Sequence, residues 1–195
     1  MKLVALAAVA AVGCTPYLSA GYDTNSSLRG PIKNMVTMPA ASARQESAPP
    51  VANTRSYSFA VGAAFGPRMG LELGAHLHDV NGASFSMPTI EQMGVDPNSP
   101  RYLLGSTSLD VRYRWLALKH FTSDLHVGPS AGLLVDRGMF DYQVGQGFRF
   151  GATVGLKLGK ISAFADVYEQ EMVFNDGDAK GVSGLTGVTF GILVR

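Results

Sequence analysis

Apolar and polar residues alternate along most of this chain from residue 55 to its end. In residues 55–66, for example, Tyr57, Phe59 and Val61 share one face, and Ser58, Ala60 and Gly62 share the other. A period of two is typical of a β-strand with one apolar face. The same pattern predicts further strands at 69–79, 102–118, 123–135, 146–158, 161–170 and 184–194.

The connections between these strands alternate in length. Short turns fall at 66–68, 119–122 and 158–160, and longer loops fall at 80–101, 136–145 and 171–183. Short turns on one rim and long loops on the other are typical of a bacterial outer-membrane barrel, and a tilted spanning strand needs about 9 to 11 residues. The pattern therefore predicts an all-β fold, an up-and-down antiparallel transmembrane β-barrel.

An eighth strand is needed because single-chain bacterial barrels have an even number of strands. The alternation of connections places a long loop before residue 55, and the segment 39–54 is rich in Pro, Ala and Ser. We therefore predict a flexible loop at 39–54 and the missing strand before it. Residues 31–38 fit this strand better than residues 17–24. The barrel domain is expected to span 29–195.

Glycine on the polar face decides which side of the barrel meets lipid. Of 23 glycines, many alternate with the apolar residues, and only 16% of the chain is charged. Glycine facing water would weaken a strand without making it soluble, whereas glycine facing a narrow lumen leaves room for long side chains. Tyr57, Phe65, Tyr113, Trp115 and Phe148 lie near strand ends on the apolar face, where aromatic girdles belong. The apolar face is therefore predicted to point outward.

In this pattern the chain resembles the small eight-stranded outer-membrane barrels of the OmpA transmembrane-domain and OmpX kind, over about residues 55–195. The resemblance implies a place in the outer membrane of a Gram-negative bacterium, contact with its lipids, and assembly by the barrel-assembly machinery. That machinery reads a last strand that usually ends in an aromatic residue. Here the strand ends as Phe190-Gly191-Ile192-Leu193-Val194-Arg195, with the alternation kept and the terminal aromatic absent.

The first thirteen residues predict export. Lys2 precedes an apolar run that is too short to span a membrane, which is typical of a signal peptide. The run ends at Ala11-Val12-Gly13-Cys14, which resembles a bacterial lipobox with Cys14 as the lipidated residue. The alternative is an ordinary secretory signal cleaved before Gly21. In the first interpretation residues 14–28 form a linker that leads from Cys14 to the barrel.

The polar face gathers charged groups of both signs. If this face lines the lumen, unpaired charges there are costly and must pair or remain hydrated. We predict a lumenal salt-bridge and hydrogen-bond network that fills the barrel, with a narrow water-filled path as the alternative. The predicted members are Glu72, His76, His78, Asp110, Arg112, Arg114, Asp124, His126, Arg149, Lys157 and Asp166.

The same face offers two chemical alternatives. His76-x-His78 can chelate zinc, and His126 is a candidate further ligand. Nothing in the sequence fixes a third ligand at a known spacing, so no metal or other cofactor is expected. Some outer-membrane barrels modify lipids, and a hydrolase needs a nucleophile beside its base. His126 and Ser130 share a face but lie about 13 Å apart along a strand. No catalytic set is therefore assigned.

The sequence thus predicts an outer-membrane barrel with a structural or surface-interaction role rather than a wide pore. The alternatives are a soluble periplasmic lipocalin-like lipoprotein that binds a hydrophobic ligand, and a membrane-embedded lipid-modifying enzyme. An unknown surface ligand is expected at the loops 80–101 and 136–145, because loops vary freely on a closed barrel. A net charge of +1 gives no reason to expect nucleic acid.

Overall fold

The computed structural model describes residues 14–31, 53–79, 102–136, 141–175 and 180–195. No helix among these residues is long and apolar enough to cross a membrane. They form eight strands: β1 (Cys14–Arg29), β2 (Asn53–Phe65), β3 (Met69–Asp79), β4 (Tyr102–Ala117), β5 (Phe121–Asp136), β6 (Asp141–Leu158), β7 (Ile161–Phe174) and β8 (Gly181–Val194).

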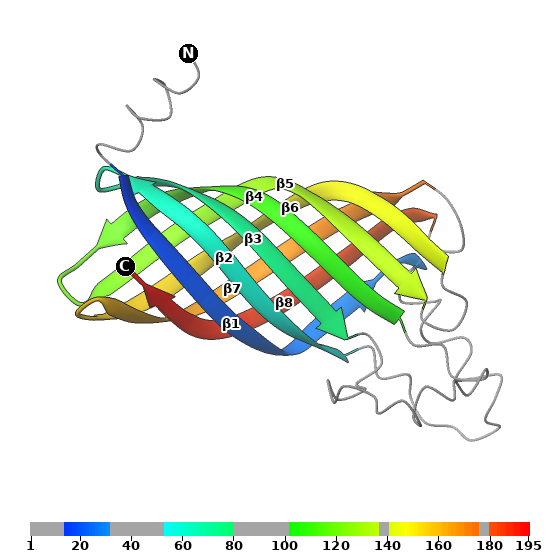
Figure 1. The fold of residues 1–195 in the computed structure, drawn as a ribbon, viewed down its shortest axis with the longest axis horizontal. Coiled ribbons are helices and arrows are strands. Elements are labelled where there is room, and N and C mark those ends of the chain that lie inside the picture. Colours follow the sequence, from blue (N-terminus) through cyan, green and yellow to red (C-terminus); the bar gives the residue numbers. More distant parts are fainter. Residues whose placement is uncertain (1–13, 32–52, 80–101, 137–140, 176–179) are drawn as a thin grey trace, which may run out of the picture.

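Each strand pairs antiparallel with its neighbours in sequence, and β1 pairs with β8 to close the sheet into a barrel (Figure 1). Closure leaves no unpaired sheet edge. The short turns at 66–68, 118–120 and 159–160, together with Cys14 and Val194, lie at one end, which we call the short-turn rim. The opposite end is the long-loop rim. The predicted all-β, eight-stranded, up-and-down barrel is confirmed.

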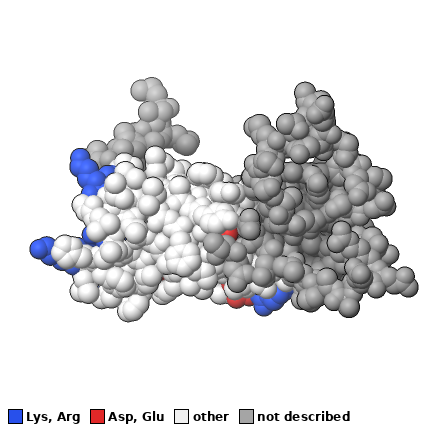
Figure 2. All heavy atoms as spheres, turned by 90° about the horizontal axis from the view of Figure 1, so that it is seen from below, with Lys and Arg blue, Asp and Glu red and all other residues white. Residues whose placement is uncertain are grey.

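The apolar rows point outward, as predicted from the glycines on the polar face. Leu18, Phe59 and Phe148 are each more than 60% exposed, and similar side chains cover the outside of the other strands. The described surface that is visible in Figure 2 is largely uncharged away from the short-turn rim. The inward positions are small, polar or charged and buried, as at Ser58, Glu72 and Asp110. This arrangement is the reverse of a soluble barrel.

The position predicted for the first strand is wrong. β1 contains residues 17–24, the segment ranked second, and it already starts at Cys14, so residues 14–28 are not a linker and the barrel begins before residue 29. Of the favoured segment, 32–38 lie outside the described residues. The pattern of β1 is weak because its register shifts between Asp23 and Ser26, which moves the inward face from odd to even positions.

Two predicted loops are shorter than expected. In the 136–145 segment, Asp136 pairs with Asp141 and residues 141–145 belong to β6, so only 137–140 lie between the strands. Likewise β7 continues to Phe174 and β8 begins at Gly181. Glycine and polar residues hid the start of β6, whereas at the end of β7 the inward-facing Met172 and Phe174 removed the apolar–polar alternation. The loop at 80–101 and residues 39–52 lie outside the described residues, and Asn53 and Thr54 belong to β2.

The barrel interior has two zones. Toward the long-loop rim, buried apolar side chains pack together, and they lie on five different strands. The cluster consists of Leu28, Leu104, Leu134, Tyr168, Met172, Phe174 and Leu185. Toward the short-turn rim, the interior is ionic. The sequence predicted the ionic zone and did not predict the apolar one.

Candidate functional site

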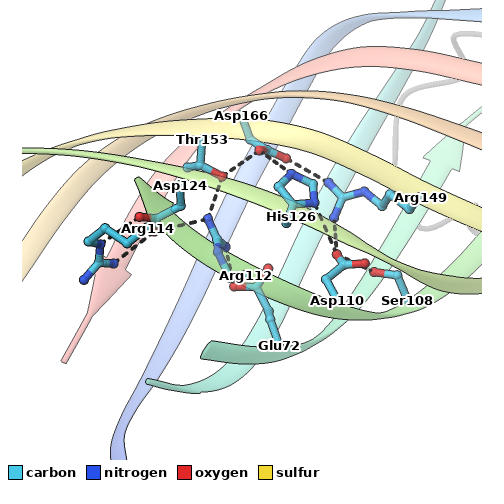
Figure 3. A network of polar contacts seen from close by, with 10 residues as sticks. All are labelled: Glu72, Ser108, Asp110, Arg112, Arg114, Asp124, His126, Arg149, Thr153 and Asp166. Atoms are coloured by element: carbon cyan, nitrogen blue, oxygen red, sulfur yellow. Dashed lines mark hydrogen bonds and ion pairs between the residues drawn. The ribbon is translucent and has the colours of Figure 1, made fainter. Parts of the chain in front are cut away.

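The ionic zone draws its side chains from β3, β4, β5, β6 and β7, which are consecutive around the barrel (Figure 3). Because side chains alternate along a strand, Asp110, Arg112 and Arg114 of β4 all point inward, one pleat apart. Facing strands supply their partners. The result is a continuous chain of polar contacts that crosses the lumen.

Arg149 of β6 is the first centre of this network. Its Nη1 donates to Asp110 Oδ2 at 3.0 Å, and its Nη2 donates to Asp166 Oδ2 at 2.9 Å. Its guanidinium also lies 4.6 Å from the centre of the Tyr168 ring. Arg149 is 3% exposed and Asp110 is fully buried. One buried cation therefore neutralises carboxylates on two other strands.

Arg112 and Arg114 of β4 form a second centre nearer the short-turn rim. Arg112 donates to Glu72 Oε2 at 2.6 Å and to Thr153 Oγ1 at 2.5 Å. Arg114 holds Asp124 through two hydrogen bonds of 2.7 and 2.9 Å, the paired geometry that guanidinium groups favour. Thr153 Oγ1 in turn donates to Asp166 Oδ1 at 2.7 Å and joins the two centres.

His126 lies between two carboxylates. Its Nε2 is 2.9 Å from Asp166 Oδ1 and its Nδ1 is 3.6 Å from Asp110 Oδ2. A serine base must keep one ring nitrogen for the nucleophile. Since both nitrogens of His126 face carboxylates, its geometry suits an ion-pair network better than hydrolysis.

His76 and His78 are buried beside the network without joining it. Their rings stack with centroids 6.1 Å apart, and His76 lies 6.0 Å from the Tyr168 ring. Neither imidazole has a hydrogen-bond partner among the described residues. Within the described part of the chain, no group of three or more His, Cys, Asp or Glu side chains is placed to hold a metal ion.

The structure thus brings together most of the residues chosen from the sequence. Eight of them contact one another directly: Glu72, Asp110, Arg112, Arg114, Asp124, His126, Arg149 and Asp166. The two other histidines are neighbours of this group. Lys157 is the exception, because it lies half-buried at the short-turn rim with no ion pair to the network among the described contacts. Cys14 begins β1 at the same rim.

Sequence reasoning missed a polar group on the other side of the lumen. Tyr168 of β7 donates its hydroxyl hydrogen to Asp23 of β1 at 2.8 Å, and Ser26 donates to the same carboxylate oxygen at 2.8 Å. Asp23 was missed because no strand was placed there. Tyr168 shares the inward face with Asp166, two residues away, and this spacing is the signal that would have found it.

The inward glycines make room for this network, as predicted. A Cβ on Gly151 would lie 2.6 Å from His126 Nε2, and one on Gly187 would lie 2.7 Å from the Tyr168 hydroxyl. The space left inside is small, about 30 Å³ in the cavity between Glu72, Arg112 and Arg149. Such a volume suits about one or two water molecules. The interior is filled rather than open.

Fold and interior together define the class: a closed eight-stranded antiparallel barrel with an apolar outside and a filled, partly ionic lumen. No family model matches the chain, and no curated protein matches it. Solved structures do share the fold. Neisserial surface protein A (NspA) is 11% identical, with 94% of this chain and 99% of that chain covered and a TM-score of 0.64.

Two further structures are similar. A major outer membrane protein from Thermus thermophilus is 14% identical, covers 93% of this chain and 98% of its own, and gives a TM-score of 0.54. The third structure is Ail, the attachment invasion locus protein of Yersinia pestis, in complex with the heparin analogue sucrose octasulfate. It is 10% identical, the alignment covers 91% of this chain and 97% of the Ail chain, and the TM-score is 0.51. At these identities the likeness is one of fold.

Proposed function

We propose that this chain spans the outer membrane of a Gram-negative bacterium and acts there as a structural or surface-interaction protein, not as a wide pore. The observation that carries this proposal is the outward apolar face on every strand. Side chains such as Leu18, Phe59, Phe148 and Ile192 are more than half exposed. An uncovered apolar surface of this extent in water would drive aggregation, whereas acyl chains cover it without cost.

The filled lumen is the reason for rejecting a wide pore. Toward one rim it is packed with leucine, methionine and aromatic side chains, and toward the other it is crossed by ion pairs. Eight-stranded barrels have just enough interior for side chains. The same orientation removes the basis for a lipocalin-like ligand cavity, which requires apolar rows facing inward.

For a role in surface interaction, we propose a binding site on the connections that follow the strand ends at the long-loop rim. The pairs β3 and β4, and β5 and β6, end there at Asp79, Tyr102, Asp136 and Asp141. The connection 80–101 is the longer of the two and supports our proposal of a surface ligand. Ail, a barrel of the same fold, is described with a bound heparin analogue, which supports a site of this kind on such a scaffold.

We further propose that Cys14 is lipidated. Cys14 pairs with Phe65 at the short-turn rim, and paired residues of neighbouring strands share a face. Phe65 is 43% exposed on the outer face, so a lipid on Cys14 would enter the bilayer directly beside the barrel. Cleavage as late as just before Gly21 would instead remove the part of β1 that pairs with residues 59–65 of β2.

Heat-modifiable migration tests the barrel proposal. Purified protein in SDS is compared unboiled and boiled, and we expect two different positions because a closed barrel resists SDS at room temperature. A single position for both samples would reject an outer-membrane barrel. The Cys14→Ser variant serves as the control, since it should keep the shift and still need detergent for extraction.

Labelling with a radioactive fatty acid tests the lipid on Cys14 separately. We expect label on the wild-type chain and none on Cys14→Ser. Equal labelling of the two chains, or no label on either, would favour an ordinary secretory signal and would leave the barrel proposal intact.

A further inference from the structure

Basic side chains gather at the short-turn rim. Arg68, Lys119, Lys160 and Arg195 are exposed there, one from each turn and one from the end of β8, and His120 lies beside Lys119. Arg114 and Lys157 lie half-buried just below them. Among the described residues of this rim the one acidic side chain is Asp124, which Arg114 already holds. Figure 2 shows Lys and Arg at this end of the barrel.

Backbone hydrogen bonds fix these cations around the rim. Arg114 N donates to Arg68 O at 2.7 Å, Lys157 N to His120 O at 2.8 Å, and Arg195 N to Lys160 O at 3.0 Å. Each bond joins a turn to a neighbouring strand or to the end of the chain. The basic residues therefore stand on a connected and ordered edge of the barrel.

No described ion pair joins the side chains of the four exposed cations to a carboxylate, and attraction to Asp124 offsets only part of the repulsion at Arg195. The pKa of Arg195 is lowered, first by partial burial and then by repulsion from Arg114. Crowded like charges of this kind favour an external anion.

The rim also continues directly into the lipid-facing surface. Leu118 and Phe121 flank Lys119 and His120, and Leu158 and Ile161 flank the Gly159–Lys160 turn. These four apolar side chains are between 37% and 64% exposed. A cation at the edge of an apolar band lies at the level where lipid headgroups meet the acyl chains.

We infer that this basic rim binds anionic phospholipid headgroups in the leaflet that it contacts. The inference rests on the proposed function, because it requires the barrel to lie in a bilayer. A lipid is favoured over an acidic protein because each exposed cation adjoins exposed apolar side chains, which match the tail below a phosphate. Because a cation near an anionic lipid surface attracts it, we expect a local enrichment of anionic lipid of roughly two- to five-fold.

Trp115 provides a local reporter. It is the one tryptophan of the chain, lies two residues before the end of β4 at this rim, and is 56% exposed on the outer face. The full chain is folded into vesicles that mix phosphatidylglycerol with phosphatidylcholine, and one of the two lipids is brominated in the upper part of its acyl chain. Bromine quenches tryptophan fluorescence on contact, so quenching measures which lipid surrounds Trp115.

We expect brominated phosphatidylglycerol to quench more than its bulk fraction predicts, and brominated phosphatidylcholine to quench less. The variant Arg68→Gln/Lys119→Gln/Lys160→Gln/Arg195→Gln should lose this preference, and so should the wild type at about 1 M salt, where the Debye length is roughly 3 Å. The control Arg29→Gln/Lys180→Gln removes cations near the opposite rim and should retain it. Each variant is first checked for heat-modifiable migration, and Lys119→Gln/Lys160→Gln replaces the fourfold variant if that one does not fold.

The outcomes separate the two proposals. Equal quenching by both lipids, or a preference that survives removal of the four cations, overturns the lipid-binding rim and leaves the barrel in place. Absence of quenching by either brominated lipid shows that the outer face does not meet acyl chains, and overturns the proposed function itself.

Discussion

At the scale of single residues, the ionic zone depends on cations that each serve more than one carboxylate. Arg149 contacts Asp110 and Asp166, and Arg112 contacts Glu72 and approaches Asp124 at 3.8 Å. Burying such charges is costly, and their mutual pairing offsets that cost. Loss of one arginine therefore removes a neighbouring cation from two buried carboxylates at once.

Arg149→Met should destabilise the barrel by about 3 to 5 kcal/mol, the usual cost of breaking a buried pair from one side. Urea unfolding in detergent micelles, followed by gel migration, measures the change. Arg149→Lys should recover only part of the lost stability, because an ammonium group lacks the planar guanidinium fork that contacts both carboxylates. Lys160→Met, an exposed cation, is the matched control and should change stability by less than about 0.5 kcal/mol. Equal stability of Arg149→Met and Lys160→Met would contradict the role given to the network.

The sequence predicted on which face of a strand each residue lies, but it could not predict which residues form ion pairs with one another. The period of two puts Asp110, Arg112 and Arg149 on the glycine-rich polar face, which the predicted barrel turns toward the lumen. Which carboxylate meets Arg149 depends on the stagger of β4, β6 and β7 around a closed cylinder. Parity also failed where a strand itself was misplaced, as with Asp23.

At the scale of elements, the strands were predictable where apolar residues are large and regular, and not where they are small or interrupted. β2, β3 and β4 start or end within three residues of their predicted limits. β1 was misplaced because a register shift breaks its period, and β6 begins five residues early because glycine and glutamine precede Phe148. Alternation reports side-chain size as much as strand structure.

The pairing of β4 with β5 is interrupted at one place without a change of register. Its described pairs pass from Ser108 with Ser130 to Val111 with Val127, and Pro129, which has no N–H to donate, lies opposite the gap. At the adjacent Gly128, a Cβ would overlap the carbonyl oxygen of Leu109. The two strands approach here as closely as glycine permits.

Gly128→Ala should therefore reduce stability by about 1 to 3 kcal/mol, because the backbone of β4 or β5 must move to admit the methyl group. Gly105→Ala in the same ladder is the matched control. A Cβ at Gly105 would come no nearer than 4.0 Å to Leu133 O, so its stability should stay the same or rise by up to about 1 kcal/mol. The urea midpoints of unfolding of the two variants measure this difference. Equal midpoints would show that the close approach of β4 and β5 at Gly128 does not require glycine.

At the scale of the whole molecule, two successive zones of side chains fill the lumen along the barrel axis. The apolar cluster around Leu104 and Met172 fills the half near the long-loop rim, and the arginine network fills the half near the short-turn rim. The apolar cluster was not predicted because strand parity assigns a side to each residue and says nothing about depth. Leu28, Leu104 and Leu134 lie on the inward face beyond the point where the polar rows end.

Two independent closures make a specific prediction for ion conduction. In planar bilayers the wild-type protein should show no porin-sized current steps, and Leu104→Ala/Met172→Ala should show none either, because the network below stays in place. Arg112→Ala/Arg149→Ala should also remain closed, since the apolar half excludes ions by dewetting. Only the combination of all four substitutions should conduct. Steps from either double variant, at matched amounts of heat-modifiable protein, would show that a single zone seals the lumen and that the other zone only packs it.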